Sequence, residues 1–369
     1  MKIAIFHDFF DSIGGGEKVA ITLAKGLNAD IITCNLNKET IYKLKCEKIR
    51  FLNLVNTLNI PPVKQIQASL CYSKCNFSKK YDFFIFSGNW APFAAKKHKP
   101  NLYYCHTPTR VFYDYYKNQM KQLNLYQKPL FYLYAKMHKF WTEKNLKYIE
   151  KFIANSANVK KRIKEYFKKD SLIIFPPIDT NKYSYKKSEN YWLSVNRLYP
   201  HKRIELQIQA FKKLPKEKLI IVGWIAKGEG CEKYLKKILK NLPKNIEIKG
   251  KIDETNLLEL YSKCKGLITT SKDEDFGMTP IEAMASGKPV IAPNEGGYKE
   301  TIINGKTGIL IDNINEDKII EAIKRINREL NENPKKYKDN CIKQSKKFDS
   351  KIFLKKIKNE IYNRINKDI

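Results

Sequence analysis

Short runs of apolar residues alternate along this chain with longer segments in which apolar positions recur every three or four residues. Such runs are typical of buried parallel strands, and such segments are typical of helices with one buried face. The expected strands lie at 2–6, 30–34, 82–87, 101–105 and 151–154, and then at 191–195, 218–223, 246–249, 266–270, 289–292 and 308–311. The expected helices lie at 16–27, 64–75, 128–150 and 157–168, and then at 201–213, 230–241, 254–263, 279–286 and 315–330.

The alternation occurs twice, which predicts an α/β protein with two Rossmann-like, doubly wound parallel-sheet domains that face an interdomain cleft. Pro176, Pro177 and the polar stretch 179–190 interrupt the pattern and are the best candidate for a linker. We therefore expect domains at 1–178 and 179–347. The segment 348–369 has helical periodicity, and we expect its helix to cross back to the first domain.

The chain is strongly basic. It has 369 residues, with 70 Lys and Arg against 38 Asp and Glu, and a formal net charge of +32. The excess is spread over both halves, and such a balance is typical of proteins that meet nucleic acid, anionic lipid or phosphorylated substrates. No sequence pattern of a nucleic-acid-binding module is present, so a basic nucleic-acid-binding protein is kept only as an alternative.

The eight cysteines form no paired CxxC motif, and several lie in apolar runs where a reduced, buried thiol is the usual interpretation. No apolar run reaches the roughly 18–20 residues that span a bilayer, and the N-terminal apolar run is too short for a signal peptide. We expect a cytoplasmic protein, attached at most to the inner face of the cell membrane.

Three glycines, at 14, 15 and 16, follow the first expected strand and precede a helix. Glycine lets backbone N–H groups approach an anion, and a helix N-terminus favours negative charge, so the motif indicates a phosphate site. The alternative is a plain tight turn. The motif is neither a Walker loop nor a GxGxxG fingerprint, which argues against nucleotide hydrolysis and NAD chemistry.

Two cations, Arg197 and Lys202, follow the first strand of the second domain. A forked and a point cation at one turn suit a phosphate-like anion. In a chain this rich in lysine, the alternative is two incidental surface charges.

Two carboxylates are separated by seven intervening residues: Glu274 is in a loop after a strand, and Glu282 is one turn into the next helix. Carboxylates accept hydrogen bonds from sugar hydroxyls, and the N–H groups at the Gly277 turn can support an anion. For an isolated pair, a solvated loop acid and an ordinary first-turn helix acid would be the better explanation.

Taken together, the three sites resemble the retaining GT-B glycosyltransferases of the GT4 group. The Glu-x7-Glu segment with its Phe-Gly turn is highly specific for this family, and the resemblance covers nearly the whole chain. The closest resemblance is to the O-antigen mannosyltransferase-like branch. Further segments that carry it are Cys105-His106-Thr107-Pro108-Thr109-Arg110, Ala154-Asn155-Ser156, Pro176-Pro177-Ile178-Asp179, Glu295-Gly296-Gly297 and Asn304-Gly305-Lys306-Thr307-Gly308.

The resemblance implies a nucleotide-sugar-binding second domain. Glu282 would hold the ribose hydroxyls and Glu274 the transferred sugar, while Arg197 and Lys202 would grip the diphosphate. One departure is Asn196, which stands where the family often has glycine. It removes no charge from the proposed site.

The resemblance also implies an acceptor-binding first domain. The backbone of Gly15 and Gly16 would meet the distal phosphate, and His106 would lie beside the transferred sugar. In the second domain, Phe276 and Gly277 would belong to the substrate-binding turn, although Asp275-Phe276 replaces a frequent Gly-Phe there.

The implied reaction is retaining hexosyl transfer to a glycan or lipid-linked glycan acceptor, with GDP-mannose favoured over a UDP-sugar as donor. A UDP-sugar-dependent transferase with a different sugar is the alternative. Asp273-Glu274-Asp275 superficially resembles a metal-binding DxD, but it lies inside the Glu-x7-Glu segment, so we expect no cofactor and no metal.

Residues 103–141 contain 12 aromatic residues in 39 positions. On the helix after Pro129, Leu130, Leu133, Tyr134, Met137 and Trp141 share one face, and Lys136, Lys139, Lys144, Lys147 and Lys151 lie largely elsewhere. Basic residues beside exposed aromatics suit a helix that lies on an anionic membrane. An ordinary domain helix with a buried aromatic face explains the pattern equally well.

Overall fold

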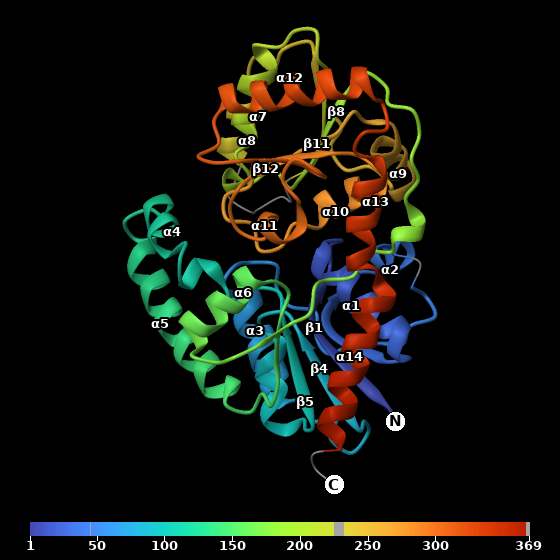
Figure 1. Cartoon of the computed structure of the whole chain (residues 1–369). Helices are drawn as coiled ribbons and strands as arrows, with labels where there is room; N and C mark the ends of the chain where they lie inside the picture. Colours follow the sequence, from blue (N-terminus) through green and yellow to red (C-terminus); the bar gives the residue numbers. More distant parts are fainter. Residues whose placement is uncertain (45, 225–231, 367–369) are drawn as a thin grey trace. The chain divides into compact units, whose positions relative to one another are not determined.

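The computed structural model describes residues 1–44, 46–224 and 232–366 (Figure 1). The chain divides into two compact units. One consists of Met1–Pro177 together with the segment that begins at Lys351, and the other is Ile178–Ser350. Each unit contains one parallel sheet covered by helices, so the predicted α/β fold class with two doubly wound sheets is confirmed.

The first unit has a seven-stranded sheet with the order β3-β2-β1-β4-β5-β6-β7. Its strands are β1 Ile3–Phe10, β2 Asp30–Leu36, β3 Phe51–Asn53, β4 Phe83–Ser87, β5 Asn101–Cys105, β6 Phe152–Ala154 and β7 Leu172–Ile173. Its α-helices are α1 Gly15–Leu27, α2 Lys38–Lys43, α3 Val63–Lys74, α4 Tyr116–Gln122, α5 Gln127–Leu146, α6 Ala157–Arg162 and α14 Ser350–Ile365.

Both faces of this sheet are buried. Successive side chains of a strand point to opposite faces, so each strand contributes to two separate apolar clusters. Phe84 and Phe86 pack on the side of α3 and α5, whereas Phe83 and Ile85 pack on the side of α1 and α14. Figure 1 shows α14 running alongside α1, next to the strands that they cover.

The second unit has a six-stranded sheet with the order β10-β9-β8-β11-β12-β13. Its strands are β8 Trp192–Val195, β9 Leu219–Val222, β10 Ile246–Ile248, β11 Leu267–Ile268, β12 Val290–Pro293 and β13 Gly308–Ile311. Its α-helices are α7 Ile204–Lys212, α8 Glu232–Leu239, α9 Glu254–Lys263, α10 Met278–Ala285, α11 Tyr298–Thr301, α12 Glu316–Glu332 and α13 Lys338–Ser345.

The strand order reverses once in each sheet, between β1 and β4 in the first unit and between β8 and β11 in the second. At such a switch point the loops at the carboxyl ends of the two strands run in opposite directions and leave a crevice, which is where open α/β sheets bind ligands. The fold therefore gives each unit one defined place for a site.

Every strand and helix expected from the sequence is present to within a few residues. Among the strands and α-helices of the described residues, those that the expectation missed are short, namely β3, β7, α2, α4, α11 and α13. They contain too few apolar positions to show a period. Residues 230 and 231, at the start of the expected helix 230–241, lie outside the described residues.

The expected linker 179–190 is instead bound along the second unit. The backbone N–H of Lys186 donates to the Ser262 carbonyl at 3.1 Å. The Tyr185 ring lies 4.5 Å from the ammonium of Lys288 and 5.1 Å from that of Lys338. The segment lies on the surface of the second unit, held by hydrogen bonds and cation–π contacts, and it follows the boundary between the two units at Pro177.

The last helix, α14, is part of the core of the first unit. Phe353, Ile357 and Ile361 recur every fourth residue and are buried in the cluster on the side of α1. Leu354 packs over Gly26 of α1 so closely that a Cβ at position 26 would overlap its side chain. No helix among the described residues is long and apolar enough to cross a membrane.

Replacing Ile357 by alanine should lower the free energy of unfolding of the first unit by about 2–4 kcal/mol, because a fully buried aliphatic side chain leaves a cavity. Chemical denaturation measures the change. The matched control is Ile352→Ala on the same helix, where the side chain is 41% exposed and the expected loss is under about 0.5 kcal/mol. Equal losses in the two variants would contradict the docking of α14.

Candidate functional site

In the first unit, three polar side chains form a row across the carboxyl ends of β1, β4 and β5. His7 and Ser87 are paired in register between the strands that flank the switch point. The Ser87 hydroxyl lies 3.1 Å from Nδ1 of His7 and 2.9 Å from Nε2 of His106, the residue after β5. The row thus connects the predicted site residue His106 to two residues that sequence reasoning did not select.

The glycine motif lies against this row. Gly14 caps α1 in an extended conformation, and α1 begins at Gly15. A Cβ on Gly16 would lie 3.4 Å from Cε1 of His7 and 3.6 Å from Nε2 of His106. The structure therefore brings together two predicted groups, the glycine turn and His106, at a helix N-terminus whose partial positive charge suits an anion.

Both histidines of the row are held neutral. Burial lowers the pKa of His7 to about 3, and the nearby His106 acts in the same direction. Burial also lowers the pKa of His106 to about 4. At neutral pH these rings offer one N–H donor and one nitrogen acceptor each, without a positive charge.

Asp8 fixes the turn that follows Ser87. Its carboxylate accepts the backbone N–H groups of Asn89, Trp90 and Ala91 at 2.6–2.8 Å. Gly88, which lies between Ser87 and Asn89, has φ +117°, and a Cβ there would overlap the Asp8 carboxylate. The His7-Asp8 pair at the end of the first strand is the signal that could have revealed this part of the site.

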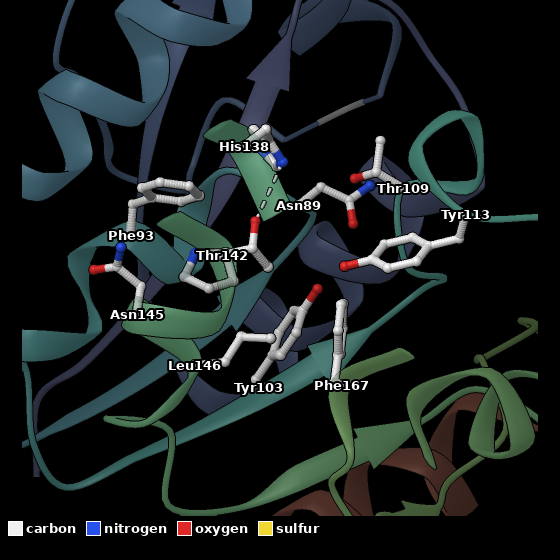
Figure 2. A pocket seen from close by; sticks show the side chains of 11 residues that line it. Asn89, Phe93, Tyr103, Thr109, Tyr113, His138, Thr142, Asn145, Leu146 and Phe167 are labelled. Carbon is white, nitrogen blue, oxygen red and sulfur yellow. Dashed lines mark hydrogen bonds between the residues drawn. The ribbon is translucent and has the colours of Figure 1, made fainter. Parts of the chain in front are cut away.

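A small cavity lies on the other face of the same sheet, under α5 (Figure 2). Aromatic residues such as Phe93 and Tyr113 line it, and His138 Nδ1 lies 3.2 Å from the Thr142 hydroxyl at its edge. The volume in which the centre of a water molecule can lie is about 10 Å³, close to the minimum that a cavity needs to hold one water. It is therefore too small for a sugar ring.

In the second unit, Arg197 follows β8 at the switch point. Its guanidinium donates to the Tyr199 hydroxyl at 3.2 Å and lies 5.4 Å from the centre of the Trp224 ring. The ammonium of Lys251 lies 5.6 Å from the same ring. Trp224 thus places two cations from different loops at one aromatic surface.

Lys202 and Glu274 form an ion pair across the same switch point. The ammonium of Lys202 donates to Oε2 of Glu274 at 2.6 Å, and both side chains are half-buried. Burial alone would raise the pKa of Glu274, but the charge of Lys202 and the hydrogen bond that Lys202 donates hold that pKa well below its usual range. The structure therefore joins two predicted residues into one ionised pair.

Glycines allow the loop of Glu274 to pack against the loop after β12. Gly296 has φ +58°, and a Cβ there would lie 2.5 Å from the Glu274 carbonyl. The N–H of Gly297 donates to that carbonyl at 2.8 Å. Gly277 has φ +87°, and a Cβ there would lie 2.7 Å from the Tyr298 ring. These contacts fix the backbone that carries Glu274.

Glu282 lies deep in α10. Its side chain is 4% exposed, and Oε2 accepts the Tyr261 hydroxyl at 2.7 Å. Burial raises the pKa of Tyr183, and the negative charge of Glu282 adds to this effect. The Tyr261 hydroxyl therefore orients the carboxylate, a contact that was not predicted from the sequence.

Phe276 has a different environment. Its side chain is 2% exposed and packs edge-on against Phe348, with ring centres 5.6 Å apart. Any contact with a substrate would come from its backbone. In the described part of the chain, no three or more His, Cys, Asp or Glu residues cluster so that they could hold a metal ion.

Solved structures share this arrangement of two sheets. The structure of Anabaena HepE in complex with UDP-glucose matches with a TM-score of 0.76 at 19% identity, over 98% of this chain and 99% of that chain. The fold defined here is the GT-B fold of glycosyltransferases.

The family model described as Glycosyl transferases group 1 matches residues 177–348, nearly the whole second unit. The second unit is thus similar to this family, in agreement with the resemblance seen in the sequence.

Curated relatives agree with this assignment. The alpha-1,3/1,6-mannosyltransferase ALG2 of Dictyostelium discoideum is 24% identical over 84% of this chain and 86% of that protein. The O-antigen chain mannosyltransferase RfbU of Salmonella typhimurium is 32% identical over 45% of this chain and 48% of that protein. An uncharacterized glycosyltransferase of Methanocaldococcus jannaschii is 29% identical, and the match spans 54% of this chain and 55% of that protein.

The His7–His106 row should make the first unit less stable in acid. A ring whose pKa is lowered by folding binds fewer protons in the folded state than in the unfolded state, so stability falls as pH drops below about 6.5. Each ring should contribute a slope of up to roughly 1.4 kcal/mol per pH unit until its folded pKa is reached. NMR titration should show the His106 ring still neutral at pH 5, and a midpoint near 6.5 would contradict its burial.

Proposed function

We propose that this chain is a retaining hexosyltransferase that moves mannose from GDP-mannose to a glycan or lipid-linked glycan, in the synthesis of a cell-surface polysaccharide or glycoconjugate. The observation that carries the proposal is that Arg197, the Lys202–Glu274 pair and Glu282 all follow β8 or β11, the strands that flank the switch point, within the family match.

The choice of donor rests on the relatives. The names of ALG2 and RfbU support mannose as the transferred sugar. The UDP-glucose bound to HepE supports the alternative, a UDP-sugar-dependent transferase. In either case, the buried Glu282 is suited to accept hydrogen bonds from the ribose hydroxyls, since a carboxylate fixed by Tyr261 loses little freedom on binding.

The cations provide the rate enhancement in this proposal. Cleavage of the bond to the anomeric carbon places additional negative charge on the distal phosphate of the leaving nucleoside diphosphate. Arg197 and Lys202 then stabilise the transition state more than the bound donor. Lys202 can do so while Glu274 binds the sugar, because the two side chains already form a fixed pair.

Retention follows in this proposal from attack on the same face as the leaving group. The leaving phosphate accepts the proton of the acceptor hydroxyl, so no protein nucleophile is required. Glu274 acts as a binding residue for the sugar, because its carboxylate is engaged by Lys202. We further propose that no metal takes part, since Arg197 and Lys202 neutralise the negative charge of the diphosphate.

In the first unit, the N–H groups at Gly15 and Gly16 would meet the distal phosphate, and His106 would hydrogen-bond a hydroxyl of the transferred sugar. The proximity of Gly16 to His106 supports this assignment, because phosphate and sugar are adjacent in the donor.

A donor panel tests the function. With a mannose-accepting glycan, GDP-mannose should be consumed faster than UDP-glucose, and GDP should raise the Tm more than UDP or ADP, since a ligand stabilises the state that it binds. EDTA should leave the rate unchanged. Turnover of UDP-sugars alone would select the alternative, and loss of activity in EDTA with recovery in Mn²⁺ would overturn metal independence.

Two variants distinguish the role of Arg197 in catalysis from that of Glu282 in nucleotide binding. Arg197→Ala should lower kcat by ~100-fold with little change in donor affinity, as for other groups that act on transition-state charge. Glu282→Gln should mainly weaken nucleotide binding. The matched control is Lys216→Ala, which removes an exposed cation just before β9, at the amino ends of the strands and so at the opposite end from Arg197. Equal effects of Arg197→Ala and Lys216→Ala on kcat would count against the site.

We also propose that α5 contacts an anionic membrane, where a lipid-linked acceptor is found. The helix face that was predicted to be apolar is partly buried and partly exposed. Tyr134 and Trp141 pack against the core, as the buried interpretation expects. Leu130, Leu133 and Phe140 are 63–69% exposed.

Further exposed apolar side chains precede or flank these residues, namely Leu125, Tyr126 and Tyr132. Lys136, Lys144 and Lys147 are exposed on the same helix. Apolar side chains enter the headgroup region of a bilayer, and each cation near an anionic surface contributes about 1 kcal/mol. The combination supports a lipid surface as the partner, since both components of membrane affinity are present.

Replacing Leu130 and Leu133 together by serine should weaken co-sedimentation with anionic vesicles by ~10-fold or more, because two exposed aliphatic side chains no longer enter the bilayer. The matched control is Tyr362→Ser, which removes an exposed apolar side chain from α14 of the same unit. Equal partitioning of the wild type onto anionic and neutral vesicles at low salt would refute the membrane contact.

A further inference from the structure

A second hollow of the first unit is open to solvent and lies at the carboxyl ends of β1 and β2, beside the loop that follows β3. The volume in which the centre of a water molecule can lie is about 500 Å³. Small-molecule sites measure roughly 300–1,000 Å³, so this hollow, unlike the cavity under α5, has room for a sugar ring. The side chains that line it come from these three segments and are Asp11, Asn35, Leu36, Asn37, Asn56 and Asn59.

The lining is almost uncharged, in contrast with the net charge of +32 of the chain. Four of the six lining residues are asparagines, and the charged one is Asp11. The Asp11 carboxylate forms an ion pair with Lys64 of α3, whose ammonium also lies 4.4 Å from the centre of the Phe9 ring. The hollow therefore offers a phosphate or an anionic lipid headgroup no excess of positive charge, and it suits a neutral polar ligand.

Three of the asparagines use their carbonyl oxygens within the protein. Oδ1 of Asn37 accepts two backbone N–H groups in the first turn of α2, at 2.8 and 3.3 Å. Oδ1 of Asn56 accepts the Asn53 amide at 2.8 Å, and Oδ1 of Asn59 accepts the Lys64 ammonium at 3.5 Å. Within residues 1–44, 46–224 and 232–366, nothing accepts a hydrogen bond from the NH₂ groups of these three side chains. The three NH₂ groups are thus left as donors for a ligand.

Hydrogen bonds between the loops hold this lining in place. The Asn35 amide donates to the Thr57 hydroxyl at 2.6 Å and accepts the Thr57 N–H at 2.5 Å, which joins the loop after β2 to the loop after β3. The backbone N–H of Asn37 donates to the Phe10 carbonyl at 3.1 Å, which joins the loop after β2 to the end of β1. A lining that is already ordered loses little freedom when a ligand binds.

Sugar hydroxyls match these groups. A hydroxyl both donates and accepts, so a sugar can bond to amide NH₂ groups and to a carboxylate in the same site. The described residues that line the hollow include no aromatic ring, on which a nucleobase would stack. They include one apolar side chain, Leu36, which suits the small apolar face of a sugar ring.

The hollow lies close to the glycine turn. Asp11 precedes Gly14, the cap of α1, by three residues, which span at most about 11 Å of chain. The strand β1 pairs with β2 on the side of the hollow and with β4, which ends at Ser87, on its other side. A ligand in the hollow is therefore near the turn at which the proposed function places the distal phosphate.

We propose that this hollow binds a neutral sugar unit of the acceptor through the side-chain amides of Asn37, Asn56 and Asn59. The role of that sugar as acceptor rests on the proposed function. The binding of a neutral sugar does not, and it can be measured without a donor.

Saturation-transfer NMR of the full chain tests the binding. The neutral probes are methyl α-mannoside, methyl α-glucoside and N-acetylglucosamine, and the anionic probes are glucuronate and inorganic phosphate. At least one neutral sugar should bind. Asn37→Ser should weaken its binding by ~5-fold, as the loss of one hydrogen bond predicts, while serine still caps α2. Asn56→Ala should have an effect of similar size, and the affinity for phosphate should stay unchanged in both variants.

The matched control is Asn76→Ser. Oδ1 of Asn76 also accepts a backbone N–H, that of Ser78 at 3.0 Å, but Asn76 precedes β4 and so lies towards the amino ends of the strands. This variant should bind the neutral sugar as the wild type does. The proposal is overturned if no neutral sugar binds, if Asn37→Ser and Asn56→Ala bind it as tightly as Asn76→Ser, or if they weaken phosphate binding instead.

Kinetics connect the hollow to the acceptor. The double variant Asn37→Ser, Asn56→Ala should raise the acceptor KM by ~20-fold with less than a ~3-fold change in donor KM, because the donor-binding residues are untouched. An unchanged acceptor KM in an active double variant would rule out the hollow as the acceptor site and leave the proposed function standing. If no donor supports turnover in the wild type, the proposed function fails, while the NMR measurement still decides whether the hollow binds a neutral sugar.

Discussion

The single reversal of strand order in each sheet determines where most of the candidate functional residues lie. In a doubly wound sheet the chain builds outward from a central strand in one direction and then returns to build in the other. Only between β1 and β4, and between β8 and β11, do neighbouring loops diverge. His7 and Ser87 flank the first of these places, and Arg197 and Glu274 follow the strands at the second. The topology of each sheet therefore determines where these candidate site residues lie.

Both places are made rigid in the same way, by a glycine that allows backbone to approach an acidic residue. In the first unit, Gly88 leaves room for the carboxylate of Asp8 to gather three N–H groups. In the second, Gly296 and Gly297 lie against the backbone of Glu274. A side chain at any of these glycines would push the loop away. The acids therefore sit on backbone whose position is set by packing, which suits groups that must be in place before a substrate arrives.

The sequence was sufficient for the parts that depend on local pattern. Buried strands, long helices and the glycine turn each leave a periodic or compositional signal, and Glu274 and Glu282 lie in a segment specific enough to indicate the family. Ser87 left no such signal, because it is one polar residue at the end of an apolar strand and lies 80 residues from its partner His7. The environment of the aromatic helix α5 was ambiguous for a related reason. Its apolar residues cover more than one face, and which of them are buried depends on packing with the rest of the unit.

The docking of α14 has a consequence for how the molecule is made. The first unit is discontinuous in sequence, since its core includes Phe353 and Ile357, which follow the whole of the second unit. During synthesis the second unit can complete its sheet while the first still lacks a helix over the apolar face beside α1. Domains usually fold in order from the N-terminus as they emerge. Here the unit that begins first is completed last, and its exposed face must be protected from aggregation until α14 leaves the ribosome.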